Sequence, residues 1–153
     1  MKFASYDIVF QEVPDEVSLA LNITGCPLHC KGCHSPHLWE DIGEVLDEQA
    51  IGSLIATYSG DITCVALMGG DADPKTVERL VRFVKLRGLK TAWYSGRQTL
   101  PDGFEVRLLD YLKLGPYVEA SGGLKSKTTN QRLYRIEKDG NMTDITYRLQ
   151  PSR

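Results

Sequence analysis

Segments with strand-like and helix-like patterns alternate along the chain, and this alternation restricts the possible folds more than any other feature of the sequence. Residues 16–23 carry apolar side chains at every second position, which is typical of a strand. Residues 48–58 carry them at helical spacing, behind Asp47 as a possible N-cap. The continuous apolar run 62–68 is typical of a strand that is buried on both faces.

The same alternation continues in the next part of the chain. Asp73 and Pro74 provide an N-cap and a first-turn proline for a second helix, which Gly88 ends. Beyond this helix we expect a strand at 89–94, a short helix near 103–109 and a strand near 110–114. Strands that alternate with helices in this way predict an α/β fold with a parallel sheet and right-handed crossovers.

Three regions lie outside the alternation. Residues 5–13 have the character of an N-terminal strand. Within 132–149, the stretches RLYRIE and TDITYRL flank Asp139-Gly140, a turn signal that is typical of a hairpin. The region 24–43 contains glycine, proline and histidine without periodicity and is expected to be a long loop, a kind of segment that is usually functional in a compact domain.

Ligand sites in parallel sheets lie at the carboxyl ends of the strands, and three features of the sequence fall there. The loop 24–43 follows the first parallel strand, residues 69–71 (Gly-Gly-Asp) follow the second, and residues 94–96 (Tyr-Ser-Gly) follow the third. Because these strand ends meet at one edge of the sheet, the three features together indicate a ligand site.

Composition narrows the class of protein. The 153 residues suit one domain, 1–153, and 20 acidic against 18 basic side chains argue against a protein that binds duplex nucleic acid. No run approaches the ~18 apolar residues of a membrane span, and the first residues become acidic too soon for a secretory signal. We therefore expect a cytoplasmic protein, in which thiols stay reduced and neither nucleic acid nor a membrane is a partner.

The cysteines are distributed unevenly. Cys26, Cys30 and Cys33 crowd into the segment CPLHCKGC, whereas Cys64 stands alone in ITCVALM, where it reads as a small buried strand residue. Clustered cysteines in a cytoplasmic chain indicate metal binding or catalysis rather than disulfides.

Two kinds of metal site remain open for the three clustered thiolates. One is a Cys3His zinc site, because His29, His34 and His37 are all near in sequence. The other is an iron–sulfur cube with three protein ligands, in which the fourth iron is open to a substrate. The spacing of three and then two residues lets one short loop reach three corners of such a cube.

The motif C-x3-C-x2-C after the first strand of a parallel α/β fold resembles the signature of radical S-adenosylmethionine (SAM) enzymes. Residues 68–71, Met-Gly-Gly-Asp, resemble the GGE motif of that superfamily, with aspartate in place of glutamate. In the family this backbone, which glycine leaves open to close approach, receives the amino group of the SAM methionine. The resemblance implies a partial, open (βα) barrel of about four to six mostly parallel strands, too few to close a barrel.

Further residues narrow the resemblance. Gly32, which stands where many members have an aromatic residue, and Trp39 resemble the activating enzymes of anaerobic (class III) ribonucleoside-triphosphate reductases. The segment LDYLKLGPYVEASGGLKSKTTNQRLYRI is also similar to that family, in Gly-Pro-Tyr at 115–117 and Asn-Gln-Arg at 130–132. The likeness covers most of residues 1–137, whereas the end of the C-terminal extension (about 115–153) matches no motif of the family.

The resemblance implies a [4Fe–4S] cluster that binds SAM at its open iron and cleaves it with one electron to give methionine and a 5′-deoxyadenosyl radical. This radical would take a hydrogen atom from a glycine of the large reductase subunit and leave a glycyl radical there. The implied partners are therefore that subunit and a small electron donor such as a flavodoxin. Exposed apolar surface is expected where the subunit docks.

The resemblance also implies particular contacts. The implied residues are Cys26, Cys30 and Cys33 as cluster ligands, Gly32, Cys33 and His34 near the adenine, and Gly69, Gly70 and Asp71 near the methionine. Tyr94, Ser95 and Lys113 are further candidates for cofactor binding because of their positions at strand ends, and Arg132 is a candidate contact of cofactor or partner. The scheme needs no general base from the protein, so we predict no catalytic residue beyond the cluster.

Two alternative functions remain. The chain could activate another glycyl radical enzyme of the pyruvate formate-lyase type, or use the same chemistry on a small molecule. It could also be a zinc-stabilised binding module without catalysis, in which one histidine closes the metal site.

Overall fold

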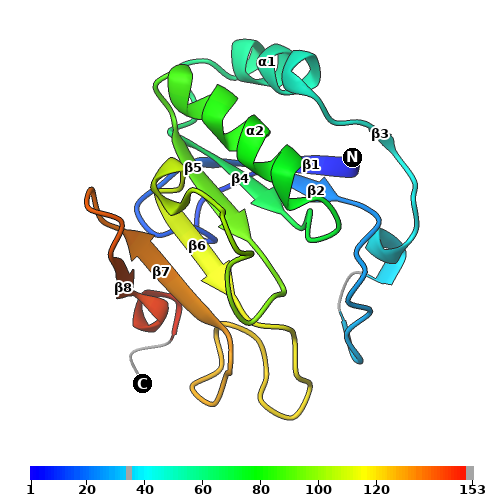
Figure 1. The fold of residues 1–153 in the computed structure, drawn as a ribbon, viewed down its shortest axis with the longest axis vertical. Helices are drawn as coiled ribbons and strands as arrows, with labels where there is room; N and C mark the ends of the chain where they lie inside the picture. Colours follow the sequence, from blue (N-terminus) through cyan, green and yellow to red (C-terminus); the bar gives the residue numbers. More distant parts are fainter. Residues whose placement is uncertain (34–35, 151–153) are drawn as a thin grey trace.

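The computed structural model describes residues 1–33 and 36–150. In this part of the chain eight strands form one sheet, in the order β3-β1-β2-β4-β5-β6-β7-β8 (Figure 1). The strands are β1 (Lys2–Val9), β2 (Ser18–Ile23), β3 (Glu44–Val45), β4 (Cys64–Met68), β5 (Lys90–Tyr94), β6 (Tyr111–Leu114), β7 (Arg132–Ile136) and β8 (Met142–Asp144).

The centre of the sheet is parallel, and both edges are antiparallel. β2, β4, β5 and β6 run in one direction, as the alternation of strands and helices predicts. β1 and β3 extend one edge, and β7 and β8 the other, all by antiparallel pairing. The sheet is thus larger and more antiparallel than the expected set of about four to six mostly parallel strands. The segments 10–17 and 137–141 are too short for a crossover, so the strands that they connect must pair antiparallel.

Two helices make the first two of the three crossovers between the parallel strands. They are α1 (Glu48–Thr57) and α2 (Pro74–Leu86), and both begin as predicted. A side-chain oxygen of Asp47 accepts a hydrogen bond from the Ala50 amide at 2.9 Å, and Asp73 caps α2 in the same way. Gly88 follows the end of α2 with φ of +80°, a conformation that favours glycine.

Three sequence predictions differ from the structure at their boundaries. The N-terminal strand, predicted at 5–13, runs from Lys2 to Val9, because the chain turns at 10–17 and buries Val13 completely. The helix expected near 103–109 is only the 3-10 turn η2 (Val106–Leu108). The stretch TDITYRL leaves the sheet after Asp144 and continues as the 3-10 turn η3 (Thr146–Leu149).

Hydrogen bonds explain why the last strand is short. Asp144 Oδ1 accepts a hydrogen bond from the Thr146 amide at 2.9 Å, where the chain passes from β8 into η3. The Thr146 hydroxyl in turn accepts the Leu133 amide of β7 at 2.8 Å. The Thr146 side chain therefore accepts the hydrogen bond that a further β8 carbonyl would have accepted. The chain leaves the sheet at this point.

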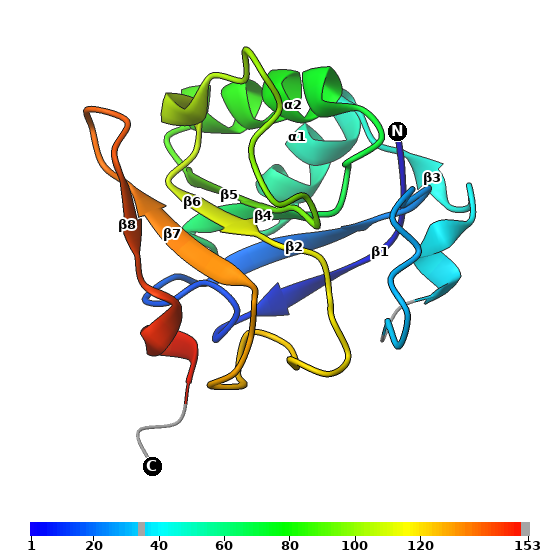
Figure 2. The ribbon, with the colours of Figure 1, turned by 60° about the horizontal axis from the view of Figure 1, so that its bottom comes forward.

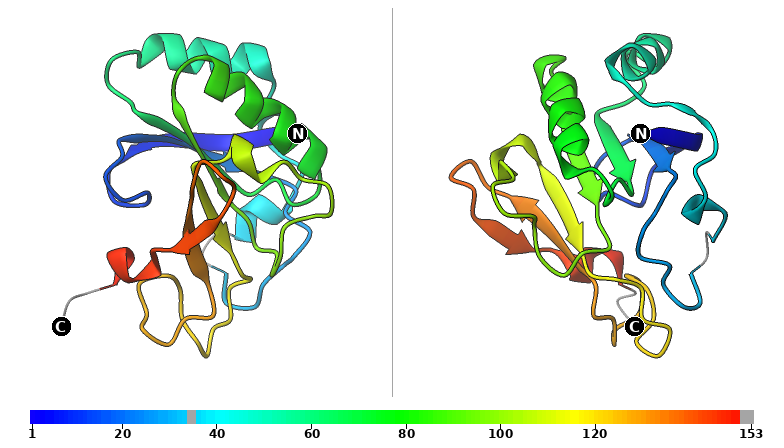
Figure 3. Two further views of the ribbon diagram at one scale, coloured as in Figure 1. Left: turned by 60° about the vertical axis from the view of Figure 1, so that its left-hand side comes forward. Right: turned by 45° about the vertical axis from the view of Figure 1, so that its right-hand side comes forward.

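The two faces of the sheet differ in their cover. α1 and α2 pack on one face and enclose the larger apolar core (Figure 2). The other face carries a smaller cluster, which consists of Val13, Cys64, Ala66, Ala92, Tyr111, Leu133 and Ile145. The sheet is strongly curved, with β7 and β8 at a large angle to β1 and β2 (Figure 3). In the described residues no helix is long and apolar enough to cross a membrane.

Candidate functional site

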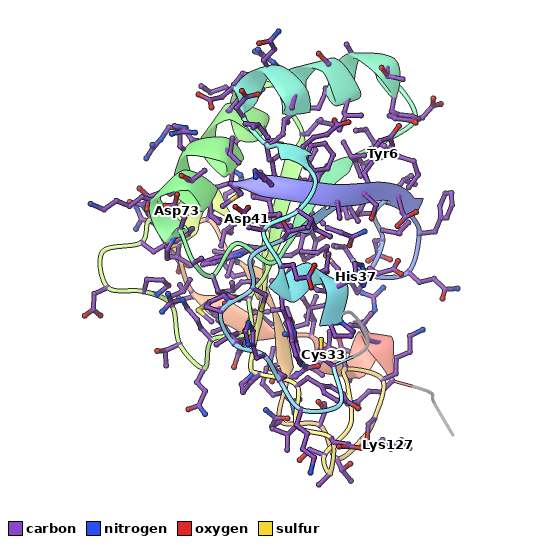
Figure 4. The ribbon with its side chains drawn as sticks, turned by 90° about the vertical axis from the view of Figure 1, so that its right-hand side faces the viewer. Tyr6, Cys33, His37, Asp41, Asp73 and Lys127 are labelled. Carbon is purple, nitrogen blue, oxygen red and sulfur yellow. The ribbon has the colours of Figure 1, made fainter. Side chains whose placement is uncertain are left out.

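The three clustered cysteines lie on the loop that leaves the carboxyl end of β2. Two backbone hydrogen bonds close this loop at its base: the Gly25 amide donates to Glu40 O, and the Cys26 amide donates to Leu38 O, both at 3.0 Å. The closing segment includes the 3-10 turn η1 (Pro36–Trp39). In Figure 4 this loop faces the viewer, with Cys33 below the turn that carries His37. The predicted long loop 24–43 is therefore held together locally, although it has no regular structure over most of its length.

The interior of the loop is compact and its thiols are reachable. The Cys33 amide donates to Cys30 O at 3.1 Å, and all three clustered cysteines are half-buried. Gly32 between them has φ of +76°, and a Cβ there would lie 3.0 Å from the Glu119 carboxyl carbon. Glycine at this position thus lets Glu119 of the segment after β6 approach the cysteine loop.

Two aromatic side chains of the loop, those of His29 and Trp39, pack against each other. The rings of His29 and Trp39 stack, with centroids 4.6 Å apart and 16° between their planes. Trp39 Nε1 is buried and finds no hydrogen-bond acceptor among the described residues. A buried donor of this kind costs ~1–3 kcal/mol unless an acceptor arrives, so the loop fits a group that brings acceptors such as cluster sulfurs.

The donor set suits iron and sulfur. Thiolates are the usual ligands of [4Fe–4S] clusters, and the loop supplies three of them within eight residues. Within residues 1–33 and 36–150, no three histidine, cysteine or acidic side chains converge as a single metal ion requires. His34, which we predicted near the adenine and as one possible zinc ligand, lies outside the described residues.

Gly69 and Gly70 form a turn without side chains at the carboxyl end of β4. Their φ values are +112° and +93°, and a Cβ on Gly70 would lie 2.7 Å from Val77 Cγ2 of α2. The Gly69 amide donates to Tyr94 O at 3.0 Å, and Gly69 O accepts the Trp93 indole N–H at 2.7 Å. Both conformation and space require glycine here, and the turn is fixed to the end of β5.

Asp71 links the ends of β4 and β5. Its carboxylate is 3% exposed and accepts the Ser95 hydroxyl at 2.5 Å and the Gly96 amide at 3.0 Å. The Arg97 guanidinium donates to Asp71 O at 2.8 Å. No sequence motif identified Arg97 as a residue of the site, because it comes beside Asp71 only in the folded chain.

Lys113 extends this hydrogen-bond network to β6. Its ammonium donates to Ser95 O at 2.9 Å and to Gly115 O at 2.8 Å. Burial lowers the pKa of Lys113 to about 8, while the charges of Asp71 and of the three clustered cysteines act in the opposite direction. The cation therefore lies at the same edge as the cysteine loop, within electrostatic reach of its thiols.

Two other predicted residues make contacts inside the protein. The Tyr94 hydroxyl donates to Glu12 O of the turn after β1, and burial raises the Tyr94 pKa. Arg132 Nε lies 2.9 Å from Asp144 Oδ2, so the side chain bridges β7 and β8. The predicted roles of Tyr94 and Arg132 in binding the cofactor or the partner therefore stay predictions.

An open cavity lies next to the cysteine loop. It has a volume of about 550 Å³ and is lined by Lys31, Tyr117, Val118, Glu119 and Ala120. The cavity joins the loop to the segment after β6, two parts of the chain that the sequence places far apart.

Comparison with known proteins identifies the family. A family model described as a 4Fe-4S single cluster domain matches residues 16–134, which run from the start of β2 into β7 and include the three clustered cysteines. Comparisons with curated proteins and with solved structures gave no match. Because the matched region covers most of the chain, this protein belongs to the family of 4Fe-4S single cluster domains.

Proposed function

We propose that this chain is a radical SAM activating enzyme that installs a glycyl radical on the large subunit of an anaerobic ribonucleoside-triphosphate reductase. One observation carries the proposal: the cysteine loop and the Gly69–Gly70 turn leave adjacent parallel strands at the same edge. Asn22 of β2 is paired with Met68 of β4, so both features begin beside each other. A cluster on the loop would therefore adjoin the Gly69–Gly70 turn, in which Gly69 is half-buried and Gly70 is buried.

In this proposal Cys26, Cys30 and Cys33 hold the [4Fe–4S] cluster and leave one iron without a protein ligand. The three cysteines are half-buried, and the indole N–H of Trp39 has no acceptor in the part of the chain that the structure describes; both observations support this assignment. Gly32 and its neighbours in the loop would receive the adenine.

The strand ends would receive the amino acid part of SAM. Gly69 is half-buried, whereas Gly70 is buried against Val77 of α2, so Gly69 is the residue of the turn that the amino acid part would approach. Lys113 supplies a positive charge for a carboxylate, and its bonds to Ser95 O and Gly115 O hold the ammonium in place. The Asp71 carboxylate would act mainly by keeping the ends of β4 and β5 together, since it already accepts two hydrogen bonds from the protein.

When held by Cys26, Cys30 and Cys33, the cluster would supply the one-electron chemistry that cleaves SAM and leads to removal of a hydrogen atom from a glycine of the partner. The electron comes from a small one-electron donor such as a flavodoxin. The chain itself positions the reactants and limits access of water. We interpret β2, β4, β5 and β6 as the core of a partial, open barrel, whose open side would admit the glycine-bearing segment.

Exposed apolar side chains beside the loop support a partner at this edge. Leu28 of the cysteine loop is 38% exposed, and Val118 of the adjacent cavity is 40% exposed. Such side chains favour association with another protein surface rather than with water.

The first test is the metal content of protein purified and reconstituted without oxygen. About four irons and four sulfides per chain are expected, with loss in Cys30→Ala and no loss in the control Cys64→Ala. Cys64 is a suitable control because it is buried and burial raises its pKa to about 12. One tightly held zinc and no sulfide would instead support the zinc-stabilised module.

The second test concerns the partner. Reduced protein is mixed with SAM and either an anaerobic reductase subunit or a pyruvate formate-lyase, and 5′-deoxyadenosine and the glycyl radical signal are measured. A signal with the reductase alone supports the proposal. A signal with the lyase alone would assign the chain to another glycyl radical enzyme, and 5′-deoxyadenosine without either signal would indicate a small-molecule substrate.

A further inference from the structure

We propose that the Leu28 side chain docks on Gly96 and thereby sets the position of the cysteine loop above the carboxyl ends of β4 and β5. Both are positioning residues in this role: they act through the loop, by placing its thiols relative to the Gly69–Gly70 turn. The inference deepens the proposed function and rests on it in one respect, namely that this loop holds the cluster.

Gly96 is required for space rather than for backbone conformation. Its φ lies outside the left-handed region, so any residue could adopt its backbone geometry. A Cβ on Gly96 would nevertheless overlap Leu28 Cδ1 and would lie 3.7 Å from Leu28 Cγ. The side chain of Leu28 therefore occupies the volume that every other residue at position 96 would fill.

The surface that receives Leu28 is rigid. The Gly96 amide donates to Asp71 Oδ2 at 3.0 Å, and the Arg97 amide donates to Ser95 Oγ at 3.0 Å. The Ser95 amide also donates to Lys113 O at 2.9 Å. These bonds fix the residues around Gly96 to Asp71 after β4 and to β6, so a clash with Leu28 would be relieved by the Leu28 side chain and the loop and not by the strand ends.

Leu28 is well placed to transmit such a displacement. It stands between the first two cysteines, next to Pro27, whose ring fixes φ. On its other side His29 has φ of +46° and stacks on Trp39. With both neighbours restrained, the Leu28 backbone has little freedom of its own, so any displacement that rotation of the Leu28 side chain does not absorb would carry the nearby cysteines with it.

The contact has a different role from the other bonds of the loop. The backbone bonds at Gly25 and Cys26, and the stack of His29 on Trp39, tie the loop to its own closing segment, 36–40. The contact of Leu28 with Gly96 ties the loop to the strand end that also holds Asp71. Loss of this contact would leave the loop closed but would change its distance from the proposed SAM site.

The test is a double-mutant cycle with Gly96→Ala, Leu28→Ala and both together. Gly123→Ala is the matched control, because Gly123 has no atom within 4 Å of an added Cβ and no left-handed φ. In cluster-free protein, urea unfolding reports the contact itself. In reconstituted protein, iron and sulfide content, the SAM dissociation constant from calorimetry and the electron paramagnetic resonance spectrum of the reduced cluster report the loop position.

We expect Gly96→Ala to keep its cluster but to weaken SAM binding about tenfold, with an altered spectrum in the presence of SAM. Leu28→Ala should weaken SAM binding less. The double variant should resemble Leu28→Ala in both SAM binding and unfolding, because the methyl group added at position 96 then fills the space that Leu28 has left. A merely structural role of Gly96 would not be rescued by shortening Leu28.

Two results would overturn the inference: SAM binding in Gly96→Ala that equals wild type, or effects of the two substitutions that simply add. Failure of the proposed function is separate from both. If wild-type protein assembles no cluster or binds no SAM, that function is wrong, while coupling in the cluster-free unfolding cycle still decides whether Leu28 docks on Gly96.

Discussion

Substitution of Lys113 by methionine should change how the stability of the cluster-free protein depends on pH. Burial lowers the pKa of this lysine from 10.5 to about 8. The unfolded chain therefore keeps a proton between about pH 8 and 10.5 that the folded chain has lost, and the free energy of unfolding rises with pH in this window. A shift of this size corresponds to ~3 kcal/mol in total. Lys113→Met has no such group and should not show the rise.

Other buried groups titrate in the same range with the opposite sign. Burial raises the pKa of Cys64 to about 12 and also raises the pKa values of Tyr94 and Tyr111. These groups stay protonated in the folded chain after they have ionised in the unfolded chain, so they lower stability as the pH rises above about 9. They are present in both proteins, and their contribution cancels when the two stability curves are subtracted.

The assay is urea unfolding of both proteins from pH 7 to 10.5, followed by circular dichroism. The stability of wild type minus that of Lys113→Met should increase by up to ~3 kcal/mol across the window. Lys75→Met, on the exposed side of α2, is the control and should give a flat difference. A flat or falling difference for Lys113→Met would refute the reasoning, since it would mean that the ammonium is not desolvated at the strand ends.

Three further predictions concern single groups around the site. Gly70→Ala should lose ~2–3 kcal/mol in urea unfolding, from a φ of +93° and a Cβ 2.7 Å from Val77 Cγ2; an unchanged midpoint would contradict the geometry. Trp39→Phe should lower the stability of the cluster-free protein by less than ~1 kcal/mol, because the lost N–H has no acceptor among the described residues. The same substitution should lower the midpoint potential of the loaded cluster, and an unchanged potential would mean that this N–H does not reach a sulfur. Tyr111→Phe should lose ~1–3 kcal/mol, because the hydroxyl donates to the buried Glu16 carboxylate at 2.8 Å, and wild-type stability would show that this bond is replaced by water.

The parallel centre of the fold could be predicted because local patterns determine it. Asp47 and Asp73 cap their helices through their own side chains, and the apolar runs between them are strands in the structure. The edges could not be predicted as well. A period-two pattern such as that of 5–13 says that a strand exists but does not say where it stops or which strand it joins.

The location of the candidate site could be predicted from the sequence, but the hydrogen bonds that connect its residues could not. Cysteine spacing and strand-end glycines are visible in the sequence, and the fold brings both to one edge. The bonds of the Asp71 carboxylate to Ser95 and Gly96 depend on the relative height of two strands, which no local pattern encodes. The approach of Arg97 to Asp71 and of Leu28 to Gly96 likewise arises only once the chain has folded.

The two halves of the site are held by different forces, and this difference bears on how the site would be loaded. At the strand ends, Asp71, Ser95 and Lys113 form charged or buried hydrogen bonds that span β4, β5 and β6 without any ligand. Among its described residues, the cysteine loop is held by backbone bonds, the stack of His29 on Trp39 and the contact of Leu28. A cluster binds thiolates, and three thiolate charges held close together without metal would repel one another, so a rigid loop would be costly before loading. Fixed strand ends, with a loop that already rests on Gly96 through Leu28 but is otherwise held by few bonds, resolve this conflict, because the strand ends define the geometry and the metal supplies the energy that completes it.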